Sequence, residues 1–259
     1  MTYRLAAVYA HPDDDTNGIA GLLAAERDGL EYTLVVATSG EAGEIADPQL
    51  ATPETLGSVR EREELASLEV VGVRDPALHF LRYPDGALAS VPREELVDRV
   101  AGILRKARPQ VVITFGPDGI TRHPDHIAAG QAATDAFHRL RREEPGDGAF
   151  RRLLYNALPK SMLDAFWAAL RERGREVDPD APFMPQGIPD DRITGRVGLD
   201  AVMDRKMKAI AAHRTQAFEF IPADLRRRAF AAEHFVQAWP PVAEDGGHVL
   251  ASVFEGLEL

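Results

Sequence analysis

Two kinds of hydrophobic pattern alternate along this chain. Short apolar runs of strand length occur at residues 5–10, 31–38, 77–81, 110–115 and 153–157. The intervals between them mostly carry apolar residues every three or four positions, which is the spacing of one helix face. Strands that alternate with helices predict an α/β fold, with a doubly wound, mostly parallel sheet covered by helices on both faces.

The same pattern indicates where individual helices begin and which faces they bury. Thr16 is the expected cap of the first helix, and Pro124 favours the first position of another, which makes His123 its N-cap. On the helix expected over residues 55–71, Leu65, Leu68 and Val71 are predicted to face inward.

The second half of the chain is less regular. Residues 193–197 are predicted to form a strand and 199–213 a helix, whereas the pattern assigns no element to the tail after residue 230. Residues 178–191 contain four prolines and are expected to form an ordered excursion that acts as a lid or shapes a pocket. No repeat or linker divides the sequence, so residues 1–259 are expected to form one domain.

Composition narrows the function. The chain has 259 residues, a net charge of −11 and no cysteine. An acidic surface argues against nucleic acid and anionic membranes as partners, and no apolar run is long enough for a membrane span. We therefore expect a cytoplasmic protein that acts on small molecules. Without thiolates, any transition metal must be bound by nitrogen and oxygen donors.

The segment His11-Pro12-Asp13-Asp14-Asp15 follows the first predicted strand. In open α/β sheets ligands bind at the carboxyl ends of the strands, which is where this segment is expected to lie. Three adjacent carboxylates repel one another unless a proton or a cation intervenes. A bound cation is therefore the simplest explanation for the segment.

The segment His123-Pro124-Asp125-His126 follows a second apolar strand. We expect His123 and His126 to reach one pocket from different directions, with Asp125 hydrogen-bonded to an imidazole. Together with the first segment they supply two histidines and at least one aspartate around an open position. Three protein ligands and a water are the arrangement of catalytic zinc.

Other functions remain open at this point. A non-haem Fe(II) enzyme also uses two histidines and a carboxylate, although nothing here predicts a β-rich scaffold. A non-catalytic metal- or sugar-binding protein is a second alternative, against which the extra carboxylate of Asp13 argues. Magnesium suits the aspartates but not His11 and His126. A dinucleotide-binding role would need a glycine-rich turn that is missing after the first strand.

The two segments together resemble those of the PIG-L/LmbE-like family of zinc-dependent N-deacetylases. Further matches extend the resemblance over roughly the first 130 residues and the helix near residues 206–216. They are Ser39-Gly40-Glu41-Ala42-Gly43, Arg60-x-x-Glu63, Tyr83-Pro84-Asp85-Gly86, and Lys206 through His213-x-Thr215-Gln216. The resemblance implies a Rossmann-like fold and a substrate of the N-acetylglucosamine-conjugate type.

The resemblance also implies roles for individual residues. His11, Asp14 and His126 would bind Zn²⁺, with Fe²⁺ as the other metal considered. Asp13 would be the general base, His123 would assist the oxyanion, and Asp125 would orient His123. Arg60 and Asp85 match positions that help hold the sugar. Apart from the resemblance, the 3–4 spacing of the late helix favours His213 as a residue that lines the site, and Arg122 is a further candidate for substrate binding.

Two positions depart from the family pattern. Asp15 stands where glutamate is commonest, and Thr121 stands where some members carry a tyrosine that assists the oxyanion. Arg122 or His123 would then contribute more, or the substrate would differ. We expect a small N-acylated sugar conjugate as the partner molecule and leave a homo-oligomer open. The remaining histidines show no ligand spacing and are expected to be structural or at the surface: His79, His138, His234 and His248.

Overall fold

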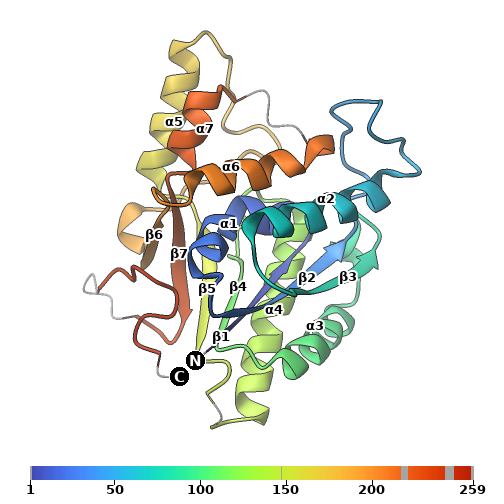
Figure 1. Cartoon of the computed structure of the whole chain (residues 1–259), viewed down its shortest axis with the longest axis vertical. Helices are drawn as coiled ribbons and strands as arrows, with labels where there is room; N and C mark the ends of the chain where they lie inside the picture. The colour runs from blue at the N-terminus through green and yellow to red at the C-terminus, as the bar shows by residue number, and fades with distance from the viewer. Residues whose placement is uncertain (1, 147, 217–220, 243–247, 258–259) are drawn as a thin grey trace.

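A seven-stranded sheet forms the centre of the computed structural model, which describes residues 2–146, 148–216, 221–242 and 248–257 (Figure 1). The strand order is β3-β2-β1-β4-β5-β7-β6. The first five strands in this order run parallel, whereas β7 is antiparallel to both β5 and β6. The strands are β1 (Tyr3–Tyr9), β2 (Leu30–Thr38), β3 (Ala77–Tyr83), β4 (Val111–Phe115), β5 (Arg152–Ala157), β6 (Gly195–Gly198) and β7 (Ala232–Trp239).

Helices cover both faces of this sheet. α1, α2 and α6 pack together on one face, and α3 and α4 pack against each other on the other (Figure 1). α5 and α7 contact each other beyond the edge of the sheet, around a small core of their own that includes Trp167. The helices are α1 (Asp14–Glu26), α2 (Leu56–Val71), α3 (Arg93–Ala107), α4 (Pro124–Glu143), α5 (Lys160–Glu172), α6 (Met203–Ala212) and α7 (Ala223–Ala229).

The predicted α/β fold is therefore confirmed, with differences in detail. The tail that the pattern left unassigned contains β7, where Phe235 is fully buried between β5 and β6. Leu65 is 54% exposed, so it does not belong to the inner face of α2 as predicted. The buried face of α2 is instead partly polar, because it packs against charged groups rather than against an apolar core. No helix in the described ranges is both long and apolar enough to cross a bilayer.

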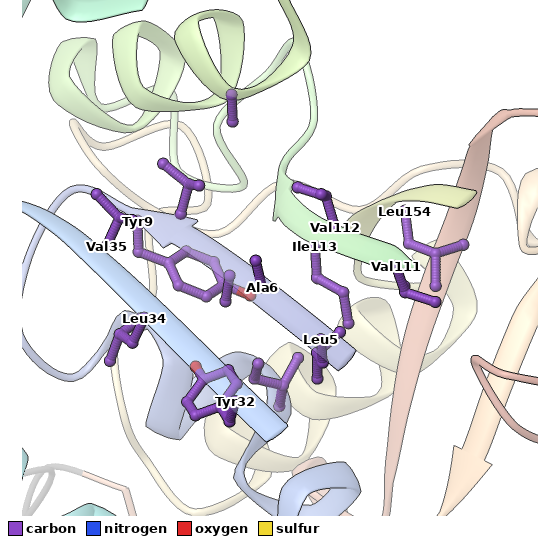
Figure 2. Close-up of a cluster of buried hydrophobic side chains, with 14 of the residues drawn as sticks. Leu5, Ala6, Tyr9, Tyr32, Leu34, Val35, Val111, Val112, Ile113 and Leu154 are labelled. Atoms are coloured by element: carbon purple, nitrogen blue, oxygen red, sulfur yellow. The ribbon is translucent and has the colours of Figure 1, made fainter. Parts of the chain in front are cut away.

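The core lies between the central strands and their helices (Figure 2). β1, β2 and β4 are near-continuous apolar runs because both of their faces are covered. Leu5, Leu34 and Ile113 are completely or almost completely buried there. Burial of this kind stabilises the fold by about 1.5–3 kcal/mol per large side chain. It makes the carboxyl ends of β1 and β4 a rigid platform.

Buried charged side chains contact the backbone of α1 one turn after it begins. The backbone amides of Gly21 and Leu22 donate at 2.8 Å to the two carboxylate oxygens of Glu233 on β7. The ammonium group of Lys206 donates to the carbonyl of Asn17 at 2.9 Å and to Glu233 at 2.6 Å. A buried ion pair thus contacts backbone amides and a carbonyl of this helix directly.

The next carbonyl of α1 is bound in the same way. Gly18 O accepts from the side-chain amide of Asn156 at 3.2 Å, and the hydroxyl of Tyr9 donates to the other end of that amide. Side chains from β1, β5, β7 and α6 therefore fix the direction of the first turn of α1. That turn carries Asp14 and Asp15.

Replacement of Lys206 by Met should destabilise the protein strongly. The side chains of Lys206 and its partner Glu233 are at most 2% exposed. Removal of one partner of a buried pair typically costs about 3–5 kcal/mol, because the other charge stays buried. The free energy of unfolding in urea measures the loss. Lys208→Met, at an exposed position of the same helix, should stay within about 0.5 kcal/mol of the wild type. A loss under about 1 kcal/mol in Lys206→Met would contradict a tight buried pair.

Candidate active site

The two sequence segments meet where the strand order reverses, between β1 and β4. His11 follows the end of β1, and His126 lies in the first turn of α4, after the end of β4. Asp85 arrives from the loop after β3. Ligands of open α/β sheets bind at such a reversal, because the loops diverge there and leave room between them. The structure thus brings together segments more than a hundred residues apart.

Three side chains form a tight group of metal-ligating atoms. His11 Nδ1 lies 3.2 Å from His126 Nε2. The Asp14 carboxylate lies 3.7 Å from His11 Nδ1 through Oδ2 and 3.5 Å from His126 Nε2 through Oδ1. All three side chains are 11–12% exposed, so the group is open on one side only.

These separations fit one shared divalent ion. Nitrogen and oxygen ligands lie about 2.0–2.2 Å from zinc, and a tetrahedral arrangement then places them about 3.3–3.6 Å apart. The two nitrogen atoms lie 3.2 Å apart, close to that range; the Asp14 distances of 3.7 and 3.5 Å are also close to it, but each involves a different oxygen of the carboxylate. Two sets of side chains in the described ranges have ligand atoms that all lie within 4.8 Å of one another, and both include His11. They are His11 with His123 and His126, and His11 with Asp85 and Asp125.

The ring of His126 is held in one orientation. Its Nδ1 donates to the carbonyl of Gly119 at 2.9 Å, which leaves Nε2 as the free acceptor on the side of His11. The ring stacks on Phe115 with 4.1 Å between centroids and 4° between planes. Thr121, where some family members have tyrosine, lies 3.3 Å from the same Nδ1. The Thr121 side chain therefore contacts the ring of His126 and does not face open space.

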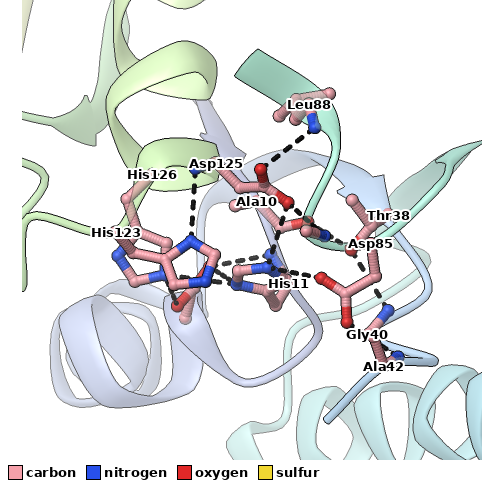
Figure 3. A network of polar contacts seen from close by, with 12 residues as sticks. Ala10, His11, Thr38, Gly40, Ala42, Asp85, Leu88, His123, Asp125 and His126 are labelled. Carbon is pink, nitrogen blue, oxygen red and sulfur yellow. Dashed lines mark hydrogen bonds and ion pairs between the residues drawn. The ribbon is translucent and has the colours of Figure 1, made fainter. Parts of the chain in front are cut away.

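Asp125 differs from its sequence-based role. Its carboxylate accepts from the backbone amides of Gly86 and Leu88 at 2.8 and 3.0 Å and points toward His11 (Figure 3). It does not orient His123; that ring instead accepts from the Asp125 backbone amide, as an N-cap. The prediction of His123 as N-cap is thus confirmed, and the predicted pairing of the Asp125 carboxylate with His123 is wrong.

His11 stands in a strongly negative environment. Its Nε2 lies 2.9 Å from Asp85 and 3.7 Å from Asp125. Burial disfavours a charged imidazole, but the contacts with Asp125 and Asp85 and the charge of Asp14 outweigh it and raise the pKa of His11 to about 10. Burial raises the pKa of Asp85, but the bond from His11 prevails and lowers it to about 2. This field favours a cation, whether a proton or a metal ion.

Asp13 lies beside this group in a strained conformation. It precedes α1 with φ 104°, a left-handed value that costs a non-glycine residue about 1–3 kcal/mol. Its amide donates to Glu64 at 2.9 Å, and its carboxylate lies 3.4 Å from the guanidinium of Arg60. Burial raises its pKa to about 7, against the opposing charge of Arg60. Such a carboxylate can exchange a proton near neutral pH.

Arg60 supports the loop that carries Asp13. Its guanidinium donates to the carbonyls of Pro12 and Gly40 at 2.7 and 2.9 Å, and the residue is only 4% exposed. Gly40 has φ +67°, and a Cβ there would lie 2.3 Å from the Arg60 side chain. The glycine motif of the sequence thus makes room for this arginine. The contact of Arg60 with the substrate stays a prediction.

A second layer of polar groups lies beneath the catalytic loop. Thr16 is not the cap of α1, which begins at Asp14; its hydroxyl instead contacts Ser67 at 2.7 Å and His213 Nε2 at 3.0 Å. Asp15, at the position where glutamate is commonest, is buried and accepts from the Tyr32 hydroxyl at 3.3 Å.

The sequence-predicted substrate residues lie at different depths. His213 is 2% exposed and belongs to the second layer rather than to an open pocket wall. Asp85 contacts His11 Nε2 at 2.9 Å and belongs to one of the sets that could hold an ion, a position that the sequence did not predict; its contact with the sugar stays a prediction. Arg122 is exposed beside His123, with φ 59°. The part of the loop 178–191 that contacts the site is Phe183, whose ring centre lies 4.7 Å from that of His123.

Comparison with known proteins decides the family. Residues 6–137 match PIG-L, the GlcNAc-PI de-N-acetylase family. This chain belongs to the PIG-L family. It is 32% identical over 252 residues to the 1D-myo-inositol 2-acetamido-2-deoxy-alpha-D-glucopyranoside deacetylase of Kribbella flavida, with 82% of each chain covered. The resemblance inferred from the motifs is therefore confirmed.

Solved structures share this fold. The conserved protein TT1542 from Thermus thermophilus has a TM-score of 0.63 and 27% identity, over 94% of this chain and 97% of that one. GalB, the 4-carboxy-2-hydroxymuconate hydratase of Pseudomonas putida KT2440, has a TM-score of 0.65 at 17% identity, over 94% and 98% of the chains. The second likeness concerns the fold alone, so in this case fold and chemistry are separate questions.

The stability of this PIG-L protein should decrease as the pH is lowered, because His213 is buried in its neutral form. Burial and the charge of Arg60 lower the pKa of His213 from 6.5 to about 3. In the unfolded chain the His213 imidazole therefore binds a proton near pH 6.5, whereas in the folded chain it stays neutral at that pH. The stability that the neutral ring contributes is complete above pH 6.5 and is lost as pH falls toward 3, at up to about 1.4 kcal/mol per pH unit.

Unfolding free energies of the wild type and His213→Gln between pH 7 and 4 measure this contribution. The variant should show the shallower slope. His79→Gln, at a more exposed position on β3, is the control and should change the slope much less. Equal slopes for the wild type and His213→Gln would contradict a neutral buried histidine.

Proposed function

We propose that this chain is a metal-dependent hydrolase that removes the acyl group from the amide nitrogen of an N-acetylglucosamine-type conjugate. The observation that carries the proposal is the juxtaposition of His11, Asp14 and His126 with a separate, buried carboxylate on Asp13. A mere binding site needs no such base. Relatives named as deacetylases of a glucosamine–inositol conjugate support the same class of substrate.

His11, Asp14 and His126 would hold the metal. Zn²⁺ suits two imidazoles and one carboxylate at these separations, and Fe²⁺ accepts the same donors. When bound, the ion would polarise the amide carbonyl and make water more acidic. Asp85, which the sequence placed near the sugar, would keep the ring of His11 in place through its contact at Nε2.

Asp13 would act as the general base. The pKa of its carboxylate is about 7, so it can take a proton from the attacking water and release it again. The contact with Arg60 fixes its direction and keeps it charged more often than burial alone would allow. Arg60 would therefore act by positioning Asp13, whatever further contact it makes with the substrate.

His123 would assist the carbonyl oxygen and the leaving amine. Its ring is half-buried, 5.0 Å from that of His11 and 5.1 Å from that of His126. Burial and those two neighbours lower its pKa, so it is mostly neutral and donates a hydrogen bond rather than a charge. Because Nδ1 accepts from the Asp125 amide, Nε2 carries the proton that would face the substrate. Arg122, exposed next to it, would contact the polar part of the conjugate.

Replacement of Asp13 by Asn should separate catalysis from metal binding. Zinc content should stay at the wild-type level, whereas the rate of amine release should fall by ~10²–10⁴, the usual range for a lost general base. Elemental analysis and a fluorescent assay for primary amines, with a panel of N-acetylated sugars and conjugates, give both values. Asp28→Asn, at an exposed position, should change neither. Near-wild-type activity in Asp13→Asn would remove this residue from the mechanism.

Replacement of single histidines should identify the metal ligands. His126→Ala should weaken zinc binding by more than the ~10–100-fold loss typical of outer groups, whereas His123→Ala should keep the metal and lose activity. Competition with a zinc chelator measures the affinity, and His138→Ala on the same helix is the control. Undiminished zinc in His126→Ala with loss in His123→Ala would favour the other histidine set. Oxygen uptake by the iron-loaded protein, without amine release, would instead support the oxygenase alternative.

A further inference from the structure

Phe183 is an exposed aromatic residue at the entrance to the site. It is 55% exposed, and only Leu65 and Val249 accompany it among the exposed large hydrophobic residues of the described ranges. A single exposed apolar residue is common on protein surfaces, so the place of Phe183 beside His123, rather than its exposure, makes it a candidate binding residue. Leu65 lies on the outer side of α2, whereas Phe183 lies against a proposed catalytic residue.

The contact with His123 locates Phe183 relative to the reacting groups. The two ring centres are 4.7 Å apart with a tilt of 46°, and the ring of His123 is 5.0 Å from that of His11. Phe183 is therefore one ring farther out than the residue proposed to face the amide. A substrate group on Phe183 would therefore be separated from the amide by the ring of His123.

The segment that carries Phe183 is fastened to the site. The amide of Gln186 donates to the carbonyl of Ile120 at 2.6 Å, and its side chain donates to Met184 O at 2.9 Å. Ile120, in the loop before His123, is β-branched and yet has φ 64°. Phe183 itself has φ 61°. Left-handed values are costly for such residues and persist mainly at functional sites, where the surroundings enforce them.

We propose that Phe183 is the stacking surface for the aglycone ring of the substrate, the ring attached to the sugar that carries the amide. This inference rests on the proposed function and specifies its substrate class: conjugates of N-acylated glucosamine with a second, saturated or aromatic ring. Phe183 is 55% exposed, so a substrate ring can cover it, and its place behind His123 assigns that ring to the part of the substrate remote from the amide.

The chemistry of a cyclic polyol fits such a surface. Its C–H bonds lie on the faces of the ring, and its hydroxyl groups project from the rim. Stacking on Phe183 removes one apolar face from water and leaves the hydroxyl groups solvated or within reach of exposed Arg122. A phenyl ring provides this contact without a hydrogen-bonding demand, so it selects for a ring and not for one pattern of hydroxyl groups.

The test compares two substrates in four proteins. N-acetylglucosamine and its α-glycoside with myo-inositol are the substrates; the wild type, Phe183→Ala, Phe183→Trp and Leu65→Ala are the proteins. Phe183→Ala should raise KM for the glycoside by about 5- to 15-fold, the loss expected for one covered aromatic face, with kcat within about twofold. KM for the monosaccharide should stay nearly constant. Phe183→Trp should restore the wild-type preference, and Leu65→Ala should have no effect.

A binding measurement makes the test independent of turnover. Titration calorimetry with the glucosamine–inositol product should show the same loss of affinity in Phe183→Ala, and none for glucosamine. Equal losses for both ligands, or an unchanged KM for the glycoside, would overturn the aglycone assignment. A fall in kcat with a shifted pH profile would also overturn it, and would indicate that Phe183 instead shields the ring of His123 from solvent. Absence of amine release by the wild type from every substrate would refute the proposed function, while the binding arm would still decide the role of Phe183.

Discussion

The concentration of negative charge at one sheet edge governs this structure. The carboxylates of Asp14, Asp85 and Asp125 surround His11, and each accepts hydrogen bonds from the backbone. Asp14 accepts from the amide of His11, Asp85 from that of Ala42, and Asp125 from those of Gly86 and Leu88. Backbone amides hold the carboxylates in place although the charges repel one another. Because three fixed carboxylates and two imidazoles converge there, the arrangement demands a positive charge. A proton on His11 supplies it in the metal-free chain, and a divalent ion would supply it more completely.

The rest of the fold keeps this arrangement rigid. The pair of Lys206 and Glu233 binds backbone groups of α1 and so holds the helix whose first turn carries Asp14. Arg60 ties the carbonyl of Pro12 to the loop after β2, which holds Asp13 in its strained backbone conformation. Both anchors are buried, and neither faces the open side of the site. Buried charge is costly, and these contacts hold the loop and the helix turn that carry Asp13 and Asp14.

The sequence predicted this site because its two motifs follow buried strands. Apolar runs at β1 and β4 placed His11 and His126 at the same edge of the sheet, where the parallel topology brings them together. The direction of a side chain on the first turn of a helix is not visible in the sequence, so Asp125 was paired with the nearby His123 rather than with distant His11. The inward position of Arg60 depends on the glycine at residue 40, whose meaning appears only when the two segments pack. β7 escaped prediction because it is half-exposed, and its pairing with β5 spans about 80 residues.

The likeness to GalB shows what the fold leaves undecided. A hydratase adds water across a carbon–carbon double bond, whereas a deacetylase must hold a tetrahedral oxyanion and return a proton to nitrogen. Both reactions use a base, so a carboxylate in the site does not by itself distinguish them. The difference lies in the donor on the opposite side of the substrate. A His123 ring whose Nδ1 is occupied by the Asp125 amide, and whose pKa is lowered by burial and its neighbours, presents an N–H to an oxygen or a departing amine. That orientation, together with membership of the PIG-L family, favours amide hydrolysis at this site.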